Sequence, residues 1–181
     1  MTPPANYFDF FGLPHKLNLD SKDLESRFYA LSKQWHPDRF ARASADQRRI
    51  SEDATATLND GYRTLKEPGL RAEYLLKEYG FDIGEQKSNN VPPELLEEVF
   101  ELNMALEEVE ESRPQLEEAR QKFGAMREEI DRDLFAQFVA YDEGQDQAVL
   151  ERIRGILNRR KYIRNLVNQV ERALNSPTTN N

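Results

Sequence analysis

The sequence predicts an all-α protein made of two helical domains. Apolar residues recur at helical spacing of three and four almost throughout, and alternating strand-like patterns are nearly absent. Charged residues make up 32% and hydrophobic residues 38% of the chain, a mix that suits helices exposing much polar surface. A polar stretch, 84–90, carries no core residue and indicates a linker. The expected organisation is a first domain, 1–80, a linker, 81–91, a second domain, 92–175, and a disordered tail, 176–181.

Two helices are expected at the start of the first domain. A short one covers 6–11. The second is N-capped by Asp20 or Ser21 and stops near His36, because Pro37 has no N–H and disfavours helical dihedrals in the residue before it. Its inward-facing residues follow helical steps: Leu24, Phe28, Leu31 and Trp35.

Two further helices complete the first domain. A polar, basic loop, 37–45, comes before a third helix over 46–67. The Pro-Gly pair at 68–69 ends that helix, and a short fourth helix covers 70–79. The inward residues of the third helix are Ile50, Ala54, Leu58, Tyr62 and Leu65.

The second domain is expected to be a bundle of three longer helices. The first opens at the Pro-Pro pair, 92–93, and the second at Ser112, whose spacing to Gln115 fits a capping box. The third covers about 145–174. The inward residues of the middle helix are Leu116, Phe123, Ile130, Leu134, Phe138 and Tyr141.

Charge is segregated between these helices. Seven basic residues stand against two acids over 150–174, whereas seven glutamates lie within 97–111. We expect the basic and acidic helices to pack antiparallel and to neutralise each other.

Composition excludes several classes of function. The formal net charge of −8 argues against a nucleic-acid or anionic-membrane binder, because phosphate contacts need clustered Lys and Arg. Without cysteine there is no disulfide, thiolate zinc site or cysteine nucleophile, and His15 and His36 cannot build a structural metal site alone. No apolar run approaches the roughly 20 residues of a membrane span, and the first residues form no signal peptide. We expect a cytoplasmic protein without a cofactor.

A His-Pro-Asp tripeptide, 36–38, lies between the two amphipathic helices of the first domain. Alone it is weak evidence, since a loop histidine can simply cap the preceding helix. Its context is more specific: Trp35 precedes it, an Arg-Phe pair, 39–40, follows it, and Tyr-Phe-Asp-Phe-Phe-Gly-Leu fills 7–13. With these features, residues 5–78 resemble the J-domain, a helical hairpin that displays this loop at its tip.

A second signature narrows the resemblance. Leu65 and Pro68 are followed by Arg-Ala-Glu-Tyr-Leu-Leu over 71–76 and then by Gly80. This run is similar to the fourth helix of HscB, the co-chaperone of iron–sulfur cluster assembly. The chain lacks the Gly/Phe-rich linker and zinc-binding region of ordinary DnaJ proteins, and an acidic three-helix segment follows, as in the HscB family.

The resemblance implies a co-chaperone and not an enzyme. The J-domain would bind the ATP state of a DnaK-type chaperone, HscA in bacterial systems, and promote its ATP hydrolysis. The second domain would bind the client, an IscU-type scaffold protein; an adaptor for a different client is the alternative. We expect a monomer or weak dimer. The residues expected to contact the chaperone are His36, Pro37, Asp38, Arg27, Lys33 and Arg39.

The helix after the linker carries two apolar stripes. One stripe, Leu95, Val99, Leu102, Leu106 and Val109, steps by four and three, as in a helix packed in a bundle. The residues of the other stripe are spaced four apart and lie beside the first stripe. This second stripe either widens the buried face of the helix or binds a partner. The resemblance favours a partner, because HscB-like proteins bind the scaffold with this helix. The expected client-binding residues are Leu96, Phe100, Glu101 and Met104, together with Tyr162, which could equally be half-buried core.

Overall fold

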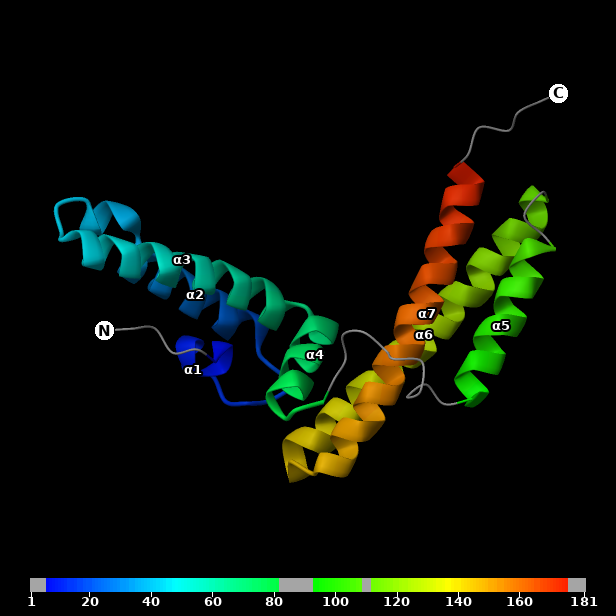
Figure 1. The fold of residues 1–181 in the computed structure, drawn as a ribbon. Coiled ribbons are helices and arrows are strands. Elements are labelled where there is room, and N and C mark those ends of the chain that lie inside the picture. The colour runs from blue at the N-terminus through cyan, green and yellow to red at the C-terminus, as the bar shows by residue number, and fades with distance from the viewer. Residues whose placement is uncertain (1–5, 82–92, 109–111, 176–181) are drawn as a thin grey trace. The chain divides into compact units, whose positions relative to one another are not determined.

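The computed structural model describes residues 6–81, 93–108 and 112–175, and every regular element in these ranges is a helix (Figure 1). The predicted all-α class is therefore confirmed. The expected linker, 84–90, and tail, 176–181, lie outside the described residues.

The chain forms two compact units. The first unit consists of Met1–Gly80 and Phe138–Gln145, and the second of Phe81–Gln137 and Asp146–Asn181. The first unit thus contains the predicted first domain, 1–80, and in addition Phe138–Gln145, which comes much later in the chain.

The first unit is built around a helical hairpin. Asn6 caps its opening helix by accepting the Phe8 N–H, and Gly12 ends that helix in the left-handed region at φ 63°. Asp20 caps the second helix, and a capping box at Ser44 opens the third. The elements in chain order are α1 (Tyr7–Phe11), α2 (Ser21–Trp35), the 3₁₀ helix η1 (Pro37–Phe40), α3 (Ala45–Lys66) and α4 (Pro68–Glu78).

Two local details differ from the sequence prediction. The stretch expected to be a loop includes η1, because Pro37 has the fixed φ that suits the first position of a helical turn. Pro68 and Gly69 open α4 instead of only ending α3, since the extended Glu67 caps α4 with its carboxylate on the Leu70 N–H.

The core of the first unit lies between α2, α3 and the helices at their base. On α2, Leu24 and Trp35 are buried, while Phe28 is half-buried and stacks on Tyr62 of α3 at 4.3 Å between ring centroids. Leu31 is also half-buried. Of the predicted inward residues of α3, three are buried and two, Ile50 and Tyr62, are half-buried. The buried apolar residues that α1, α3 and α4 contribute are Phe8, Phe10, Phe11, Ala54, Leu58, Leu65, Ala72, Leu75 and Leu76.

The segment at the end of α6 (Arg113–Gly144) is bonded into this unit. The Asp142 carboxylate accepts the N–H groups of Leu17, at 2.7 Å, and Asn18, at 2.8 Å. Next to it, the Tyr141 ring is fully buried and meets Tyr79 edge-on at 6.4 Å. The two hydrogen bonds to Asp142 satisfy the backbone N–H groups of Leu17 and Asn18, which have no partner within a helix.

A buried arginine lies in the first unit as well. Arg71 of α4 donates from Nη1 to the Leu65 carbonyl at the end of α3, at 2.7 Å. Burial lowers the pKa of Arg71, and the nearby carboxylates of Asp142 and Glu67 oppose that shift.

The second unit is a bundle of α5 (Pro93–Glu107), α6 (Arg113–Gly144) and α7 (Gln147–Asn175). All six residues predicted to face inward on α6 are buried, which confirms the helical stripe. Two of them, Phe138 and Tyr141, are buried within the first unit. One cluster of buried residues in the bundle core contains Leu102, Leu106, Leu116, Phe123, Ile130, Ile163, Leu166, Val167 and Val170.

The direction of the helices corrects one expectation. The basic helix α7 runs antiparallel to α6, and Arg160 binds Asp131 between them at 2.6 Å. However, α7 runs parallel to the acidic α5, because each of three consecutive helices reverses direction (Figure 1). Basic residues of α7 are nevertheless paired with acidic residues of both neighbours, since Arg159 of α7 also pairs with Glu98 of α5.

Candidate interaction surfaces

The His-Pro-Asp loop lies exposed between α2 and α3. The side chain of His36 is 54% exposed and that of Asp38 is 91% exposed. His36 Nδ1 accepts the backbone N–H of Asp38 at 3.3 Å and lies 3.5 Å from the Asp38 carboxylate. Because Nδ1 is the acceptor, the proton of the neutral ring is carried by Nε2. The loop therefore offers one ring donor and one carboxylate to a partner.

The backbone of this loop is held from inside the hairpin. The Trp35 carbonyl accepts a hydrogen bond from Ser51 Oγ of α3 at 2.7 Å. Thr55 Oγ1 of α3 lies 3.1 Å from the same carbonyl and shares its one proton with the Ser51 carbonyl, which lies 2.8 Å away. Helix α2 ends here, and the Arg39 N–H that would have bonded Trp35 instead bonds the His36 carbonyl at 3.0 Å. Ser51 is fully buried, so the start of the loop is fixed to the inner face of α3.

The basic residues predicted for the chaperone surface differ in their environments. Lys33 and Arg39 are exposed, and Arg39 also donates to the Lys33 carbonyl at 3.1 Å. Arg27 is half-buried. Its Nη1 bonds the carbonyls of Phe11 and Gly12 at 3.1 and 2.7 Å, and its Nε bonds Asp23. Arg27 therefore joins α1 to α2, and of the three basic residues predicted for this surface, Lys33 and Arg39 are the exposed ones.

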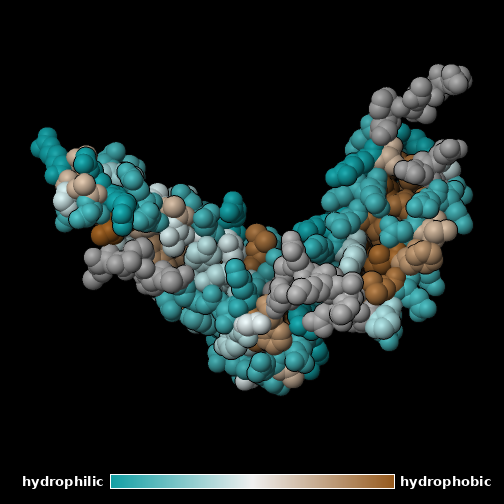
Figure 2. Space-filling view, viewed as in Figure 1, coloured by the Kyte–Doolittle hydropathy of each residue, from teal (hydrophilic) through white to brown (hydrophobic). Residues whose placement is uncertain are grey.

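The two stripes of α5 lie in different environments. Leu95, Leu102 and Leu106 are each 8% exposed, whereas Phe100 is 64% exposed. Val99 is half-buried, and Val109 lies outside the described residues. We call the exposed stripe the α5 patch; Figure 2 shows apolar side chains gathered over this part of the second unit. Its members and their exposed fractions are Leu96, 46%, Phe100, 64%, and Met104, 45%.

Polar and aromatic neighbours surround the α5 patch. Glu97 and Glu101 are exposed on the same helix. Tyr162 is half-buried on α7, which packs against α5. Glu101 and Tyr162 each lie three residues beyond the Glu98–Arg159 pair on their own helix.

A metal-binding cluster and a membrane-spanning helix are both absent from the part of the chain that the structure describes. No group of three or more His, Asp or Glu side chains there is placed to hold a metal ion. Among the helices in those ranges, none is both long and apolar enough to cross a membrane.

Comparisons with known proteins cover both units. Residues 91–171 match a family model described as the HSCB C-terminal oligomerisation domain. Over 171 residues the chain is 34% identical to the co-chaperone protein HscB homolog of Shewanella loihica, with 93% of this chain and 96% of the relative covered. The chain belongs to the HscB family. The homolog from Vibrio vulnificus is also 34% identical, over 167 residues, with 92% and 95% covered.

Solved structures agree with this HscB assignment. The chaperone HscB from Vibrio cholerae superposes with a TM-score of 0.69 at 36% identity, covering 92% of this chain and 96% of that one. The human co-chaperone protein HscB gives a TM-score of 0.76 at 26% identity, covering 94% and 84%. The predicted family and fold, a J-domain followed by a three-helix bundle, are therefore confirmed. The Shewanella loihica and human relatives are named as co-chaperones and not as enzymes.

Sequence reasoning missed the two residues that hold the loop of this HscB-family chain. Ser51 and Thr55 lie one turn apart on the inner face of α3, opposite the end of α2. The available signal was a small hydroxyl pair on an otherwise apolar helix face, next to a helix that a proline must end.

Proposed function

We propose that this protein is a co-chaperone that delivers an IscU-type scaffold protein to a DnaK/HscA-type chaperone and stimulates ATP hydrolysis there. Iron–sulfur cluster transfer would be promoted as a result. The observation that carries the proposal is the His-Pro-Asp loop, which is exposed at its side chains and fixed at its backbone. The family membership of the whole chain supports it.

The loop acts by binding and not by chemistry on its own residues. A ligand shifts a chaperone between conformers only if it binds one conformer better than the other. Pro37 fixes its own φ, and the bonded Trp35 carbonyl fixes the chain before it, so little backbone freedom is lost on binding. The exposed His36 ring and Asp38 carboxylate then provide polar contacts that depend on the conformer of the chaperone.

The α5 patch supplies the client site in this proposal. Three apolar side chains project from one helix face, with Phe100 the most exposed. Glu97 and Glu101 lie beside them and are also exposed. A client with an apolar depression and a basic rim complements this surface. In this proposal Tyr162 extends the surface onto α7.

Replacement of the loop histidine tests the chaperone half of the proposal. His36→Gln should abolish stimulation of the ATPase of a DnaK-type chaperone, while the thermal melt stays within a few degrees of wild type. His15→Gln is the matched control, because His15 belongs to the same unit, pairs with Asp9 at 2.9 Å and is remote in sequence from the loop. Stimulation by His36→Gln near the wild-type level would contradict the proposal.

A titration with an IscU-type scaffold protein tests the client half. We expect saturable binding that raises stimulation further when scaffold and chaperone are both present. Stimulation of the chaperone without any scaffold binding would favour the alternative, a J-domain adaptor for a different client.

A further inference from the structure

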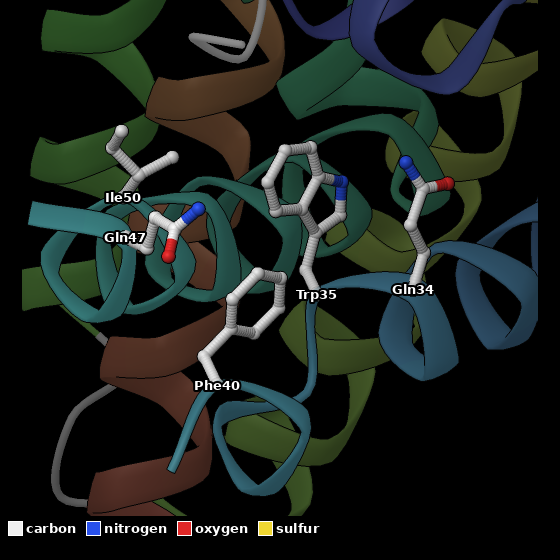
Figure 3. Close-up of a pocket in the computed structure, with 5 residues that line it drawn as sticks. All are labelled: Gln34, Trp35, Phe40, Gln47 and Ile50. Carbon is white, nitrogen blue, oxygen red and sulfur yellow. The ribbon is translucent and has the colours of Figure 1, made fainter. Parts of the chain in front are cut away.

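A pocket of about 250 Å³ lies at the tip of the hairpin. Figure 3 shows that its walls come from three elements: the end of α2, the 3₁₀ turn η1 and the start of α3. The Trp35 and Phe40 rings lie nearly parallel, with planes 11° apart and centroids 6.4 Å apart. We call this the tip pocket; its lining residues are Gln34, Trp35, Phe40, Gln47 and Ile50.

The tip pocket adjoins the loop. Trp35 immediately precedes the His-Pro-Asp tripeptide, and Phe40 follows it by two residues. Phe40 and Ile50 are both half-buried, so apolar surface remains accessible at this place. The exposed amides of Gln34 and Gln47 stand at its edge.

The size of the tip pocket selects the kind of occupant. Sites for small molecules and cofactors usually enclose about 300–1,000 Å³. The tip pocket is smaller and is lined mainly by aromatic and aliphatic carbon, so it suits a single apolar side chain supplied by a protein.

Charge around the tip pocket selects the kind of partner. Over residues 33–50 the basic side chains are Lys33, Arg39, Arg42, Arg48 and Arg49, and the acidic ones are Asp38 and Asp46. Five positive charges against two negative leave an excess of three, although the whole chain carries −8. All seven side chains are exposed. An acidic segment is therefore attracted to this end of the protein, and an acidic second copy of the chain as a whole is not.

We propose that the tip pocket receives one apolar side chain from an acidic segment of the chaperone. The inference rests on the proposed function, because the chaperone supplies the occupant. The loop then discriminates between chaperone conformers, and the tip pocket provides an apolar anchor that sets affinity. Buried anchors of this kind, surrounded by polar contacts, dominate the energy of many interfaces.

The single tryptophan of the chain permits a direct test. Trp35 is the only tryptophan, so labelling with 5-fluorotryptophan gives one fluorine resonance that reports on the pocket wall. We expect this resonance to shift when a DnaK-type chaperone is added with ATP, and to be unchanged by dilution of the protein alone. An unchanged resonance under conditions in which the chaperone ATPase is stimulated would overturn the inference while leaving the proposed function intact. A dilution-dependent shift would assign the pocket to a second copy and would also overturn it.

Filling the tip pocket gives an independent test. Ile50→Phe should raise the concentration for half-maximal ATPase stimulation at least tenfold and leave the maximal rate unchanged, whereas His36→Gln should remove the maximal stimulation itself. Ala56→Phe is the control, because Ala56 is exposed on the same helix and does not line the pocket.

A second variant covers the case in which Ile50→Phe fails to fold. Ile50→Asp leaves the pocket open, adds a charge that repels an acidic segment, and should raise the half-maximal concentration by a similar factor. If a folded Ile50 variant of either kind stimulates with a half-maximal concentration within twofold of wild type, the inference is wrong.

Discussion

Arg159 of α7 binds the Glu98 carboxylate of α5 through two nitrogens, with Nη2 2.7 Å from Oε1 and Nε 3.0 Å from Oε2. The hydrogen bonds to Glu98 raise the pKa of Arg159. Together with Leu95, Leu102 and Leu106, this pair fixes α5 against its neighbours and so determines which face of α5 is left outside.

A double-mutant cycle on Glu98→Ala and Arg159→Ala should therefore give a coupling energy of about 1 kcal/mol, measured by denaturant unfolding. The bidentate geometry and partial burial place the pair above a typical surface ion pair. The same cycle on Asp60 and Arg63, an exposed i,i+3 pair, is the control and should give no more than about 0.5 kcal/mol. Equal couplings would show that Arg159 does not fix α5.

The two stripes of α5 should respond oppositely to truncation. Leu102→Ala and Leu106→Ala leave cavities in the bundle core and should each cost about 2–5 kcal/mol of unfolding free energy. Leu96→Ala and Phe100→Ala remove exposed carbon and should each change stability by less than about 0.5 kcal/mol.

Client affinity should follow the reverse order. The double variant Leu96→Ala/Phe100→Ala should weaken scaffold binding by about 2 kcal/mol or more, roughly thirtyfold, in a direct titration. Its basal stimulation of the chaperone should remain, because the loop belongs to the other unit. A large fall in the melting temperature of this variant would instead show that Leu96 and Phe100 are part of the packed core.

Loss of the hydroxyls that hold the loop should be strongly non-additive. Ser51→Ala leaves Thr55, which otherwise also bonds the Ser51 carbonyl, as the α3 hydroxyl within reach of the Trp35 carbonyl, and Thr55→Val leaves Ser51; each variant alone should cost about 0.5–1.5 kcal/mol. The double variant leaves that carbonyl without a donor from α3, and should cost about 1 kcal/mol more than the sum of the two. Urea unfolding of the three variants measures this. Simple additivity would mean that the carbonyl has another partner after mutation.

Two tyrosines of the first unit should differ in the role of their hydroxyls. Tyr74 accepts the Tyr7 N–H at 3.0 Å, so Tyr74→Phe should cost about 1 kcal/mol at pH 7. The buried Tyr141 hydroxyl has no hydrogen-bond partner among the described residues, so Tyr141→Phe should be neutral or slightly stabilising there.

The stability of the protein at alkaline pH should depend on Tyr141. Burial raises the pKa of Tyr141 well above its ordinary value, and the neighbouring Tyr79 adds to the effect. The folded state then holds the phenolic proton of Tyr141 more tightly than the unfolded state does. The resulting contribution to the free energy of unfolding is full below about pH 10 and is lost as the pH rises above that value. Tyr141→Phe should therefore flatten the fall in stability above about pH 10. An unchanged alkaline slope would contradict the burial of a neutral hydroxyl.

Periodic features were predictable from sequence. All six inward positions of α6 are buried, because a helix with one buried face must repeat apolar residues at its own period. The second stripe of α5 was recognisable for the same reason, and its exposure agrees with the expectation that it is not needed by the core.

Features that depend on tertiary contacts were not predictable. The bonds of Arg27 to the carbonyls of Phe11 and Gly12 depend on where α1 ends relative to α2, and no local pattern encodes that. The parallel course of α5 and α7 follows from the connections between helices and not from their charge. The inclusion of Asp142 in the first unit rests on partners 124 and 125 residues away in the sequence.

The inclusion of Phe138–Gln145 in the first unit has a consequence for biosynthesis. A chain made from its N-terminus at about 5–20 residues per second needs about 3–13 s to extend the 65 residues from Gly80 to Gln145. During that interval the N–H groups of Leu17 and Asn18 lack their carboxylate acceptor, and Tyr79 lacks the ring that packs against it. The first unit is therefore completed only after α5 has already been translated. A nascent or prematurely terminated chain that lacks the end of α6 therefore has a first unit without the contacts of Tyr141 and Asp142.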